Sequence, residues 1–395
     1  MNIALFASAF HPHFGGVEEL VRQLAHELQR RGHGVIVLTN RWPRNLPAFE
    51  EFEGLPVYRL PFRTSEQSLK SKISYRLTHE GICEKTQRIL DRHAIDVLHV
   101  QCVSSNAHYA LRARARRPRP LVVTLQGELT MDANRIFERS KGARATLREA
   151  LREAEVVTGC SSKTVRDAEG FLGGPLPDAR TIFNAANLDD FAQAKPWTHA
   201  QPYIFALGRL VPQKGFDLLI EAYADAALPA HDLLIAGDGP ERARLEQLIQ
   251  RRGLEGRVHL LGRAGRPQVA SLFLGCSFFA LPSRADEGLP VVCAEAMAAG
   301  KAVVAARAGG TPEAVLDGEN GIIFEKEDRP ALVAGLRRLA GDPALRERFG
   351  AAGVRRSVQF SWPNITEQYL AAYRDAARKA GLASSNAEPV LAAHD

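Results

Sequence analysis

The chain has only five cysteines among its 395 residues, no long apolar run, and no recognisable leader. The cysteines are odd in number and show no C-x-x-C spacing, which favours reduced thiols used in packing over disulfides or a metal site. The apolar run near the N-terminus is far too short to span a bilayer, and it has no basic flank or cleavage site. We therefore expect a cytoplasmic protein.

Three missing motifs narrow the chemistry further. The sequence contains no G-x-x-x-x-G-K-[ST] phosphate loop, and its first glycine turn, "AFHPHFGG", is not the G-x-G-x-x-G of dinucleotide binders. No two aspartates stand two positions apart, so the Asp-x-Asp metal site of many Mg- or Mn-dependent sugar transferases has no counterpart. We expect no metal and no bound cofactor.

The composition is that of an ordinary soluble protein, with 45% hydrophobic and 24% charged residues. The formal net charge is +6 and the isoelectric point is near 9.1, which favours anionic partners such as sugar nucleotides, phospholipid headgroups or nucleic acid. Charge alone does not choose among these partners. No aromatic residue interleaves with the basic run "LRARARRPRP", so nucleic acid has little support.

Short apolar runs alternate with helical patterns twice along the chain, which is typical of α/β domains with parallel sheets. The alternation stops in the polar, proline-bracketed segment 192–202 and then restarts. We expect two tandem Rossmann-like domains facing a cleft, at residues 1–195 and 203–360. Residues 361–381 read as an amphipathic helix, and residues 382–395 as a disordered tail.

The stretch "EGLPVVCAEAMAAG" places Glu287 and Glu295 eight positions apart in almost wholly apolar sequence. It follows a predicted strand, and its helix is expected to begin near Pro290. The amides of Gly288 and Leu289 then lie near the positive end of the helix dipole, where ligand oxygens bind readily. A buried, unpaired carboxylate is costly, so Glu295 needs a partner or a ligand with donor groups. The alternative is that each glutamate only holds its neighbouring loop.

The second motif, "GRLVPQKGFDLLIEA", follows the first predicted strand of the second half. Gly208 lets the backbone turn, and Arg209 and Lys214 put two cations at the end of the strand. Such cations suit a diphosphate that carries no metal. Surface arginine and lysine are more often merely solvated, so the motif gains weight from the nearby glutamates.

Together these motifs resemble the retaining, nucleotide-sugar-dependent glycosyltransferases of the GT-B fold, a group that includes mannosyltransferases and sucrose synthases. The resemblance covers nearly the whole chain, and it also includes "HFGGVEELVRQLAHELQRRGHGV", "IAGDGPERARLEQL", "GGTPEAV" and "FSWPNITEQYLAAY". It implies an acceptor-binding first domain, a donor-binding second domain, and a last helix that crosses back to pack on the first domain.

The resemblance also implies roles for matching residues. Arg209 and Lys214 would hold the donor diphosphate, Glu287 with the amides of Gly288 and Leu289 would position the transferred sugar, and Glu295 would bind the ribose hydroxyls. The remaining donor contacts implied are Gly15, Gly16, Gly208, Gly237, Asp238, Gly239 and Arg263. The donor would be a UDP- or GDP-sugar, used without metal.

One departure from the family concerns Gln126, which stands where many relatives have a histidine. Glutamine donates and accepts hydrogen bonds but is no base near neutral pH. If the reaction retains the anomeric configuration by front-face attack, the donor phosphate can take the acceptor proton instead. A second departure is Ala185, which follows Asn184 where relatives often have glycine.

Candidate acceptor contacts are Glu128 and Asp132, which lie close to Gln126; helix capping or surface exposure is the alternative. The run "LRARARRPRP", together with "SLKSKISYR", is a candidate contact for an anionic membrane or a phosphorylated acceptor, against the commoner reading of a solvated face. A hydroxyl acceptor that is anionic or lipid-linked, used by an enzyme peripheral to the inner face of the membrane, fits these runs.

The sequence thus predicts a retaining glycosyltransferase, with two other readings left open. One is an epimerase or phosphorylase on the same fold. The other is a catalytically silent, sugar-nucleotide-binding partner of an active transferase, which Gln126 favours and the intact set of Arg209, Lys214, Glu287 and Glu295 disfavours.

Overall fold

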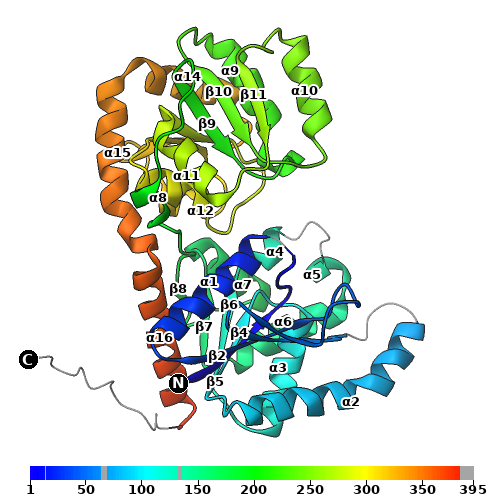
Figure 1. The fold of residues 1–395 in the computed structure, drawn as a ribbon. Coiled ribbons are helices and arrows are strands. Elements are labelled where there is room, and N and C mark those ends of the chain that lie inside the picture. Colours follow the sequence, from blue (N-terminus) through cyan, green and yellow to red (C-terminus); the bar gives the residue numbers. More distant parts are fainter. Residues whose placement is uncertain (14, 64–68, 132–135, 383–395) are drawn as a thin grey trace, which may run out of the picture. The chain divides into compact units, whose positions relative to one another are not determined.

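The computed structural model describes residues 1–13, 15–63, 69–131 and 136–382 (Figure 1). The chain divides into two compact units. The first unit comprises Met1–Ile182 together with Thr366–Asp395, and the second comprises Phe183–Ile365. The expected disordered tail lies outside the described residues beyond Leu382.

The first unit is built on an eight-stranded sheet with the order β3-β4-β2-β1-β5-β6-β7-β8. All neighbouring strands are parallel except β3 and β4, which form an antiparallel edge. The strands are β1 (Asn2–Ala7), β2 (Gly34–Asn40), β3 (Phe49–Phe52), β4 (Leu55–Leu60), β5 (Val97–Gln101), β6 (Leu121–Leu125), β7 (Val156–Gly159) and β8 (Arg180–Thr181).

Helices connect and cover these strands, as expected where parallel strands need crossover connections. They are α1 (Gly16–Arg30), α2 (Leu69–Arg92), α3 (Ser105–Arg116), α4 (Glu128–Met131), α5 (Ile136–Arg139), α6 (Lys141–Glu153), α7 (Ser162–Leu172) and α16 (Trp362–Lys379). From Thr366 onward α16 belongs to the first unit, where Tyr369 and Tyr373 are buried. The hydroxyl of Tyr373 is hydrogen-bonded to Nδ1 of His99 on β5 at 2.7 Å.

The second unit has a six-stranded, wholly parallel sheet with the order β11-β10-β9-β12-β13-β14. Its strands are short apolar runs because both faces of the sheet are covered. Ile204 and Ala206 of β9 pack into one buried cluster, while Tyr203 and Phe205 pack into another. The strands are β9 (Tyr203–Leu207), β10 (Asp232–Ala236), β11 (Val258–Gly262), β12 (Phe278–Leu281), β13 (Val303–Ala306) and β14 (Gly321–Phe324).

Helices lie on both faces of this second sheet (Figure 1). They are α8 (Asp190–Gln193), α9 (Phe216–Ala226), α10 (Arg242–Arg251), α11 (Arg266–Gly275), α12 (Val291–Ala298), α13 (Thr311–Ala314), α14 (Arg329–Gly341) and α15 (Pro343–Ser357), with the 3₁₀ turns η1 (Pro212–Lys214) and η2 (Val358–Phe360). The helix expected near Pro290 begins at the next residue, and Pro290 is its N-cap.

The polar segment 192–202, expected as a linker, lies inside the second unit. The amide of Trp197 donates to the carbonyl of Ser271 at 2.8 Å, and the ring of Phe191 meets that of Phe273 edge-on at 6.1 Å. The units divide after Ile182, earlier than the expected border at residue 195. Contacts of this kind with α11 hold the segment and the residue before it, and they produce no periodic apolar pattern.

Candidate active site

The order of strands in the second sheet reverses between β9 and β12. From β9 the sheet continues to β10 and β11, and from β12 it continues to β13 and β14. Ligands of open α/β sheets bind outside the carboxyl ends of the strands at such a reversal. The loop after β9 carries Arg209 and Lys214, and the loop after β12 carries Glu287. Both predicted motifs therefore lie in the two loops that flank the reversal.

Lys214 and Glu287 form an ion pair between these two loops. Nζ of Lys214 lies 2.6 Å from Oε1 of Glu287, and the hydroxyl of Ser283 donates to the same oxygen at 2.6 Å. Glu287 is only 9% exposed. Among the described residues, no donor is bonded to its other oxygen, Oε2. One oxygen of Glu287 is thus fixed by protein donors, and the second is available to a ligand.

The backbone after Glu287 offers donors as well. Gly288 and Leu289 are buried, yet their amides donate no hydrogen bond within the part of the chain that the structure describes. They immediately precede Pro290, the N-cap of α12. Buried amides of this kind require an acceptor from water or a ligand. Their place before a helix also suits an oxygen that carries negative charge.

Glu295 has a protein partner that the sequence did not indicate. Its side chain is 4% exposed, and Oε1 lies 2.5 Å from Nη1 of Arg266 at the start of α11. Nη2 of the same guanidinium lies 2.5 Å from Asp190. Burial raises the pKa of Glu295, and the attraction to Arg266 opposes that rise. Glu287 and Glu295 therefore bind separate cations.

The loop after β10 packs backbone to backbone against the loop after β9. The amide of Gly208 donates to Ala236 at 3.1 Å, and the amide of Leu210 donates to Asp238 at 3.0 Å. Gly237 has φ of +138°, and a Cβ there would overlap the carbonyl of Gly208. At Gly239 a Cβ would overlap the carbonyl of Leu210. These glycines let the two loops approach each other.

The charged side chains beside these loops are exposed. Arg209 has no hydrogen bond or ion pair from its guanidinium among the residues described. The Arg263 side chain is 85% exposed, and its Nε lies 3.7 Å from Asp238. The other oxygen of Asp238 accepts from the amide of Gly239 at 2.9 Å. An uncommitted arginine next to a switch point is free to bind an anion.

Two further contacts shape the loop that carries Glu287, and the sequence reading did not include them. The amide of Gly310 donates to the carbonyl of Glu287 at 2.8 Å, and the amide of Gly309 donates to Asp286 at 3.0 Å. Gly309 has φ of +57°, and a Cβ there would overlap the backbone of Glu287. The sequence "GGTPEAV" was a visible signal for this contact, since paired glycines mark close backbone approach.

In the first unit, Gly15 and Gly16 begin α1 at the carboxyl end of β1. Gly15 is the N-cap, with extended backbone and no side-chain cap. A Cβ at Gly16 would meet nothing within 4 Å. The packing around Gly16 therefore does not require glycine, and there is open space beside the first turn of the helix.

Gln126 lies at the end of β6 in a buried polar network. Its Nε2 donates to Gln101 at 3.1 Å, and Gln101 in turn is 3.2 Å from Nε2 of His99. The same nitrogen of His99 lies 2.7 Å from the hydroxyl of Thr124. Burial lowers the pKa of His99 to about 3, so this imidazole is neutral at physiological pH. Gln126 is held as part of this network.

Glu128, a candidate acceptor contact, is buried and hydrogen-bonded to the backbone of two loops. It is 8% exposed, and its two oxygens accept from the amides of Val103 and Gln126 at 2.6 and 2.8 Å. Burial raises its pKa, against those backbone hydrogen bonds. Glu128 thus ties the loop after β5 to the loop after β6, a role that the sequence did not indicate, and it is not the exposed side chain that one alternative expected. Asp132 lies outside the described residues.

The arginines of the run at residues 111–120 are paired with acids. Their partners come from α2, α6 and the residue before β7, and the pairs are Arg112–Glu149, Arg114–Glu153, Arg114–Glu155, Arg116–Glu80, Arg117–Asp91 and Arg119–Asp91. Because nearby acids neutralise these arginines, the run fits a solvated face better than a surface that attracts anions. No helix within the described ranges is long and apolar enough to cross a bilayer.

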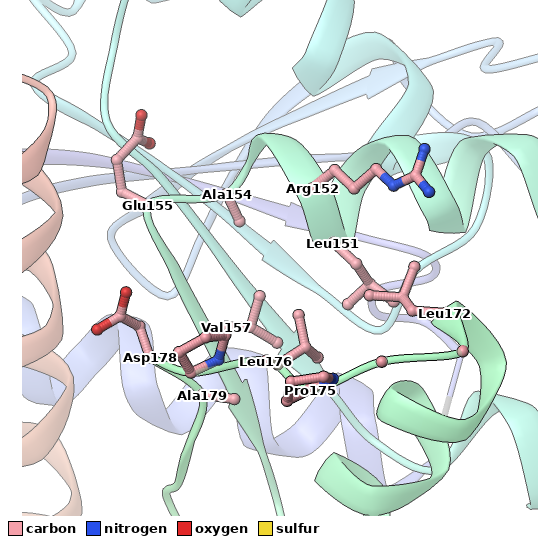
Figure 2. Close-up of a pocket in the computed structure, with 13 residues that line it drawn as sticks. Leu151, Arg152, Ala154, Glu155, Val157, Leu172, Pro175, Leu176, Asp178 and Ala179 are labelled. Atoms are coloured by element: carbon pink, nitrogen blue, oxygen red, sulfur yellow. The ribbon is translucent and has the colours of Figure 1, made fainter.

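A pocket of about 380 Å³ lies in the first unit, between the end of α6 and the segment after α7 (Figure 2). Leu151, Val157, Leu172 and Leu176 form its apolar wall. It lies beside Glu155, the residue before β7, and thus at the amino end of a strand whose carboxyl end pairs with Leu125, next to Gln126. The pocket is therefore separate from the strand ends that carry the predicted site residues.

Two family models match the chain. Residues 15–185 match the Glycosyl transferase 4-like domain, and residues 189–356 match Glycosyl transferases group 1. The two matches account for most of both units. With its two Rossmann-like α/β units and its returning C-terminal helix, the chain has the GT-B fold. It belongs to the group 1 glycosyltransferases.

The similarity to known proteins covers nearly the full length of the chain. An uncharacterized glycosyltransferase of Methanocaldococcus jannaschii is 28% identical over 91% of this chain and 94% of its own length. The GDP-mannose-dependent alpha-(1-6)-phosphatidylinositol monomannoside mannosyltransferase of Mycolicibacterium smegmatis is 27% identical over 88% and 92%. Anabaena HepE, solved in complex with UDP, has a TM-score of 0.75 at 23% identity, covering 94% of this chain and 99% of its own. The last likeness shows the fold.

Proposed function

We propose that the chain is a retaining, metal-independent glycosyltransferase that moves a hexosyl group from a UDP- or GDP-sugar to a hydroxyl acceptor. The observation that carries this proposal is the Lys214–Glu287 pair at the strand reversal, with Oε2 of Glu287 and the amides of Gly288 and Leu289 still uncommitted. Family membership supports a transferase. The named activity of the mycobacterial relative supports GDP-mannose as a donor, and the HepE complex supports a uridine nucleotide.

In this proposal Arg209 and Lys214 bind the donor diphosphate. The ammonium of Lys214 has three donors and uses one for Glu287, so it can keep that contact while it binds phosphate oxygens. Negative charge grows on the diphosphate as the glycosidic bond breaks. Fixed cations at that position stabilise the transition state more than the ground state, which is how they accelerate transfer.

The neutral part of the donor is assigned to the remaining groups. Oε2 of Glu287 accepts hydrogen bonds from the hydroxyls of the transferred sugar. The amides of Gly288 and Leu289 donate hydrogen bonds to them. Glu295 binds the ribose diol through its second oxygen while Arg266 holds the first. The loop of Gly208, Gly237, Asp238 and Gly239 lines the nucleotide, Arg263 contacts the base, and Gly15 and Gly16 approach the phosphates.

The proposed transfer needs no protein base. The acceptor oxygen bonds to the anomeric carbon on the face from which the diphosphate departs, and the leaving diphosphate takes both the electron pair and the acceptor proton. Gln126 hydrogen-bonds to reacting groups without taking a proton. Comparison of the anomeric configuration in donor and product by NMR tests retention, and an inverted product would contradict it.

The acceptor is proposed to be a hydroxyl of a glycan, a small molecule or a lipid-linked glycan met at the cytoplasmic face of a membrane. The mycobacterial relative is named for a phosphatidylinositol monomannoside acceptor, which supports the lipid-linked class. Because the arginines of residues 111–120 are already paired with acids, any contact with an anionic membrane would have to use other residues.

Calorimetric titration with UDP, GDP and ADP in the presence of EDTA tests the donor site. We expect one nucleotide to bind without metal, and the Arg209→Ala, Lys214→Ala double variant to lose that binding by at least about 10-fold, as charged hydrogen bonds of this kind contribute more than 1.4 kcal/mol. The matched control is Arg251→Ala, Arg338→Ala, which removes the same charge from α10 and α14.

Equal losses in both double variants would mean that general charge, and not this site, attracts the nucleotide. Unchanged binding in Arg209→Ala, Lys214→Ala would place the donor elsewhere. If the nucleotide binds but no sugar is released or transferred with any acceptor, the chain is a silent binding partner.

A further inference from the structure

Three potential metal ligands lie close together at the amino ends of strands in the second sheet. His199 lies in the segment that leads into β9, Asp232 is the first residue of β10, and His259 is the second residue of β11. Strand register brings them together, because Asp232 pairs with Tyr203 of β9 and Leu234 pairs with His259. The cluster is at the amino ends of the strands, whereas Lys214 and Glu287 follow carboxyl ends.

The ligand atoms are close to the spacing that a small cation requires. Nε2 of His199 lies 2.8 Å from Oδ2 of Asp232, and Nε2 of His259 lies 3.9 Å from the same oxygen. Every pair among the three ligand atoms lies within 4.8 Å. In tetrahedral zinc, bonds of about 2.0–2.2 Å place ligand atoms about 3.3–3.6 Å apart. Small rotations of these side chains would bring all three ligand atoms into the coordination sphere of one ion.

The carboxylate is oriented by a group outside the cluster. Nε of Arg257 donates to Oδ1 of Asp232 at 2.6 Å, and Nη2 of the same guanidinium is fixed by the carbonyls of Leu228 and His231 at 2.8 and 2.7 Å. This leaves Oδ2 facing the two imidazoles. Burial alone would raise the pKa of Asp232, but hydrogen bonds from Arg257 and His199 outweigh burial and hold it below its usual value. The carboxylate is therefore ionised at neutral pH.

The imidazoles remain accessible while the acid is buried. The side chains of His199 and His259 are 22% and 35% exposed, against 6% for Asp232. The ring of Tyr203 meets that of His199 edge-on at 5.8 Å and limits its rotation. A hydrated cation can therefore reach both imidazoles and the carboxylate; on binding it displaces the proton that Nε2 of His199 shares with Oδ2 of Asp232, and water can complete its coordination.

We propose that His199, Asp232 and His259 bind a divalent first-row transition metal, with Zn²⁺ as the representative ion. Two imidazoles and one carboxylate form a borderline donor set that suits Zn²⁺ and not Mg²⁺ or Ca²⁺, which prefer oxygen. The bound ion ties the segment before β9 to β10 and β11. It is separate from the proposed donor site, so sugar transfer itself stays independent of metal.

Zinc binding to tag-free, full-length protein tests the proposal. After EDTA treatment and removal of the chelator, Zn²⁺ is titrated in competition with a chromophoric chelator. We expect one equivalent to bind in wild type and the affinity to fall at least about 10-fold in His199→Ala, His259→Ala, because even indirect contacts to a metal carry losses of this size. Zn²⁺ should raise the thermal midpoint of wild type and should not raise that of His199→Ala, His259→Ala.

The matched control is His79→Ala, His108→Ala. These residues form another close histidine pair, with Nε2 atoms 2.9 Å apart in the first unit. If this variant loses the zinc and His199→Ala, His259→Ala keeps it, the site is wrongly placed. If wild type binds no zinc, the cluster is only a hydrogen-bonded network around Asp232, and the proposal fails.

Folding and metal binding are separated by two further measurements. Circular dichroism and nucleotide titration report whether each variant is folded. If the double variant does not fold, the single His259→Ala variant, which removes the more exposed ligand, replaces it. Wild-type zinc affinity in a folded His259→Ala variant would overturn the assignment.

Discussion

At the scale of single residues, the second unit places each predicted acid against a different cation. Glu287 pairs with Lys214 across the strand reversal, and Glu295 pairs with Arg266 on α11. The two pairs differ in burial: Glu295 is nearly inaccessible, whereas the Arg266 side chain is 45% exposed. Removal of the arginine therefore leaves a buried carboxylate without a cation, which should lower the free energy of unfolding.

We predict that Arg266→Ala lowers the free energy of unfolding by about 2 kcal/mol at neutral pH, less than the loss from a fully buried pair because the arginine is half exposed. Burial already raises the pKa of Glu295, and removing Arg266 raises it further. A raised carboxyl pKa gives stability that is present at low pH and lost as pH rises through the folded-state value. The loss should therefore be smaller at pH 5 than at pH 7.5.

Urea unfolding at the two pH values measures this difference. Arg244→Ala serves as the control, because its ion pairs with Glu241 and Asp217 leave the arginine 59% exposed. The control should change stability by less than about 1 kcal/mol at either pH. A pH-independent loss in Arg266→Ala would mean that Glu295 does not titrate in the expected way.

At the scale of elements, the site depends on how closely its loops pack. The loops after β9 and β10 touch through their backbones at Gly208 and Gly237, and the loops after β12 and β13 do so at Glu287 and Gly309. Side chains at these contacts would separate the loops. Glycine is therefore required by geometry at the edge of the sheet where the donor is proposed to bind.

We predict that Gly237→Ala lowers the free energy of unfolding by about 2 kcal/mol or more, since it combines φ of +138° with overlap on the Gly208 carbonyl. Displacement of the Arg209 loop should also weaken nucleotide binding. Thermal unfolding and calorimetry measure the two effects. Gly256→Ala, where a Cβ meets nothing within 4 Å, should leave both nearly unchanged. Similar results for the two variants would contradict the close packing.

The sequence was sufficient to predict the alternation of strands and helices because buried parallel strands are continuous apolar runs, as at residues 203–207 and 232–236. It also indicated Lys214 and Glu287, which belong to recognisable motifs. It did not reveal that Arg266 pairs with Glu295 or that Glu128 binds two backbone amides. Those contacts join separate elements, and only the strand order brings such residues together.

At the scale of the whole molecule, the first unit is discontinuous in sequence. The chain leaves it after Ile182 and returns at Thr366, so α16 packs on a sheet whose strands all come from the first half of the chain. The hydrogen bond between Tyr373 and His99 spans 274 positions, and both side chains are buried. The stability of the first unit thus depends on residues at the far end of the chain.

We predict that Tyr373→Phe destabilises the first unit by about 1–3 kcal/mol, because the nitrogen of His99 loses its partner in a buried site. Tyr75→Phe, which removes a similar contact to the partly exposed His108 at 3.0 Å, should have a smaller effect. Hydrogen exchange followed for each unit separately measures both. Loss of protection confined to the second unit in Tyr373→Phe would contradict the prediction.

The ion pair between Lys214 and Glu287 joins residues 73 positions apart in the chain. Lys214 follows β9 and Glu287 follows β12, and these two strands lie side by side in the sheet although β10 and β11 come between them in the chain. Contacts between residues so far apart in the chain form slowly, because a long loop must close first. Nucleotide affinity is therefore a sensitive gauge of whether the second unit has folded completely, and a fragment that ends before β12 lacks half of the proposed diphosphate and sugar contacts.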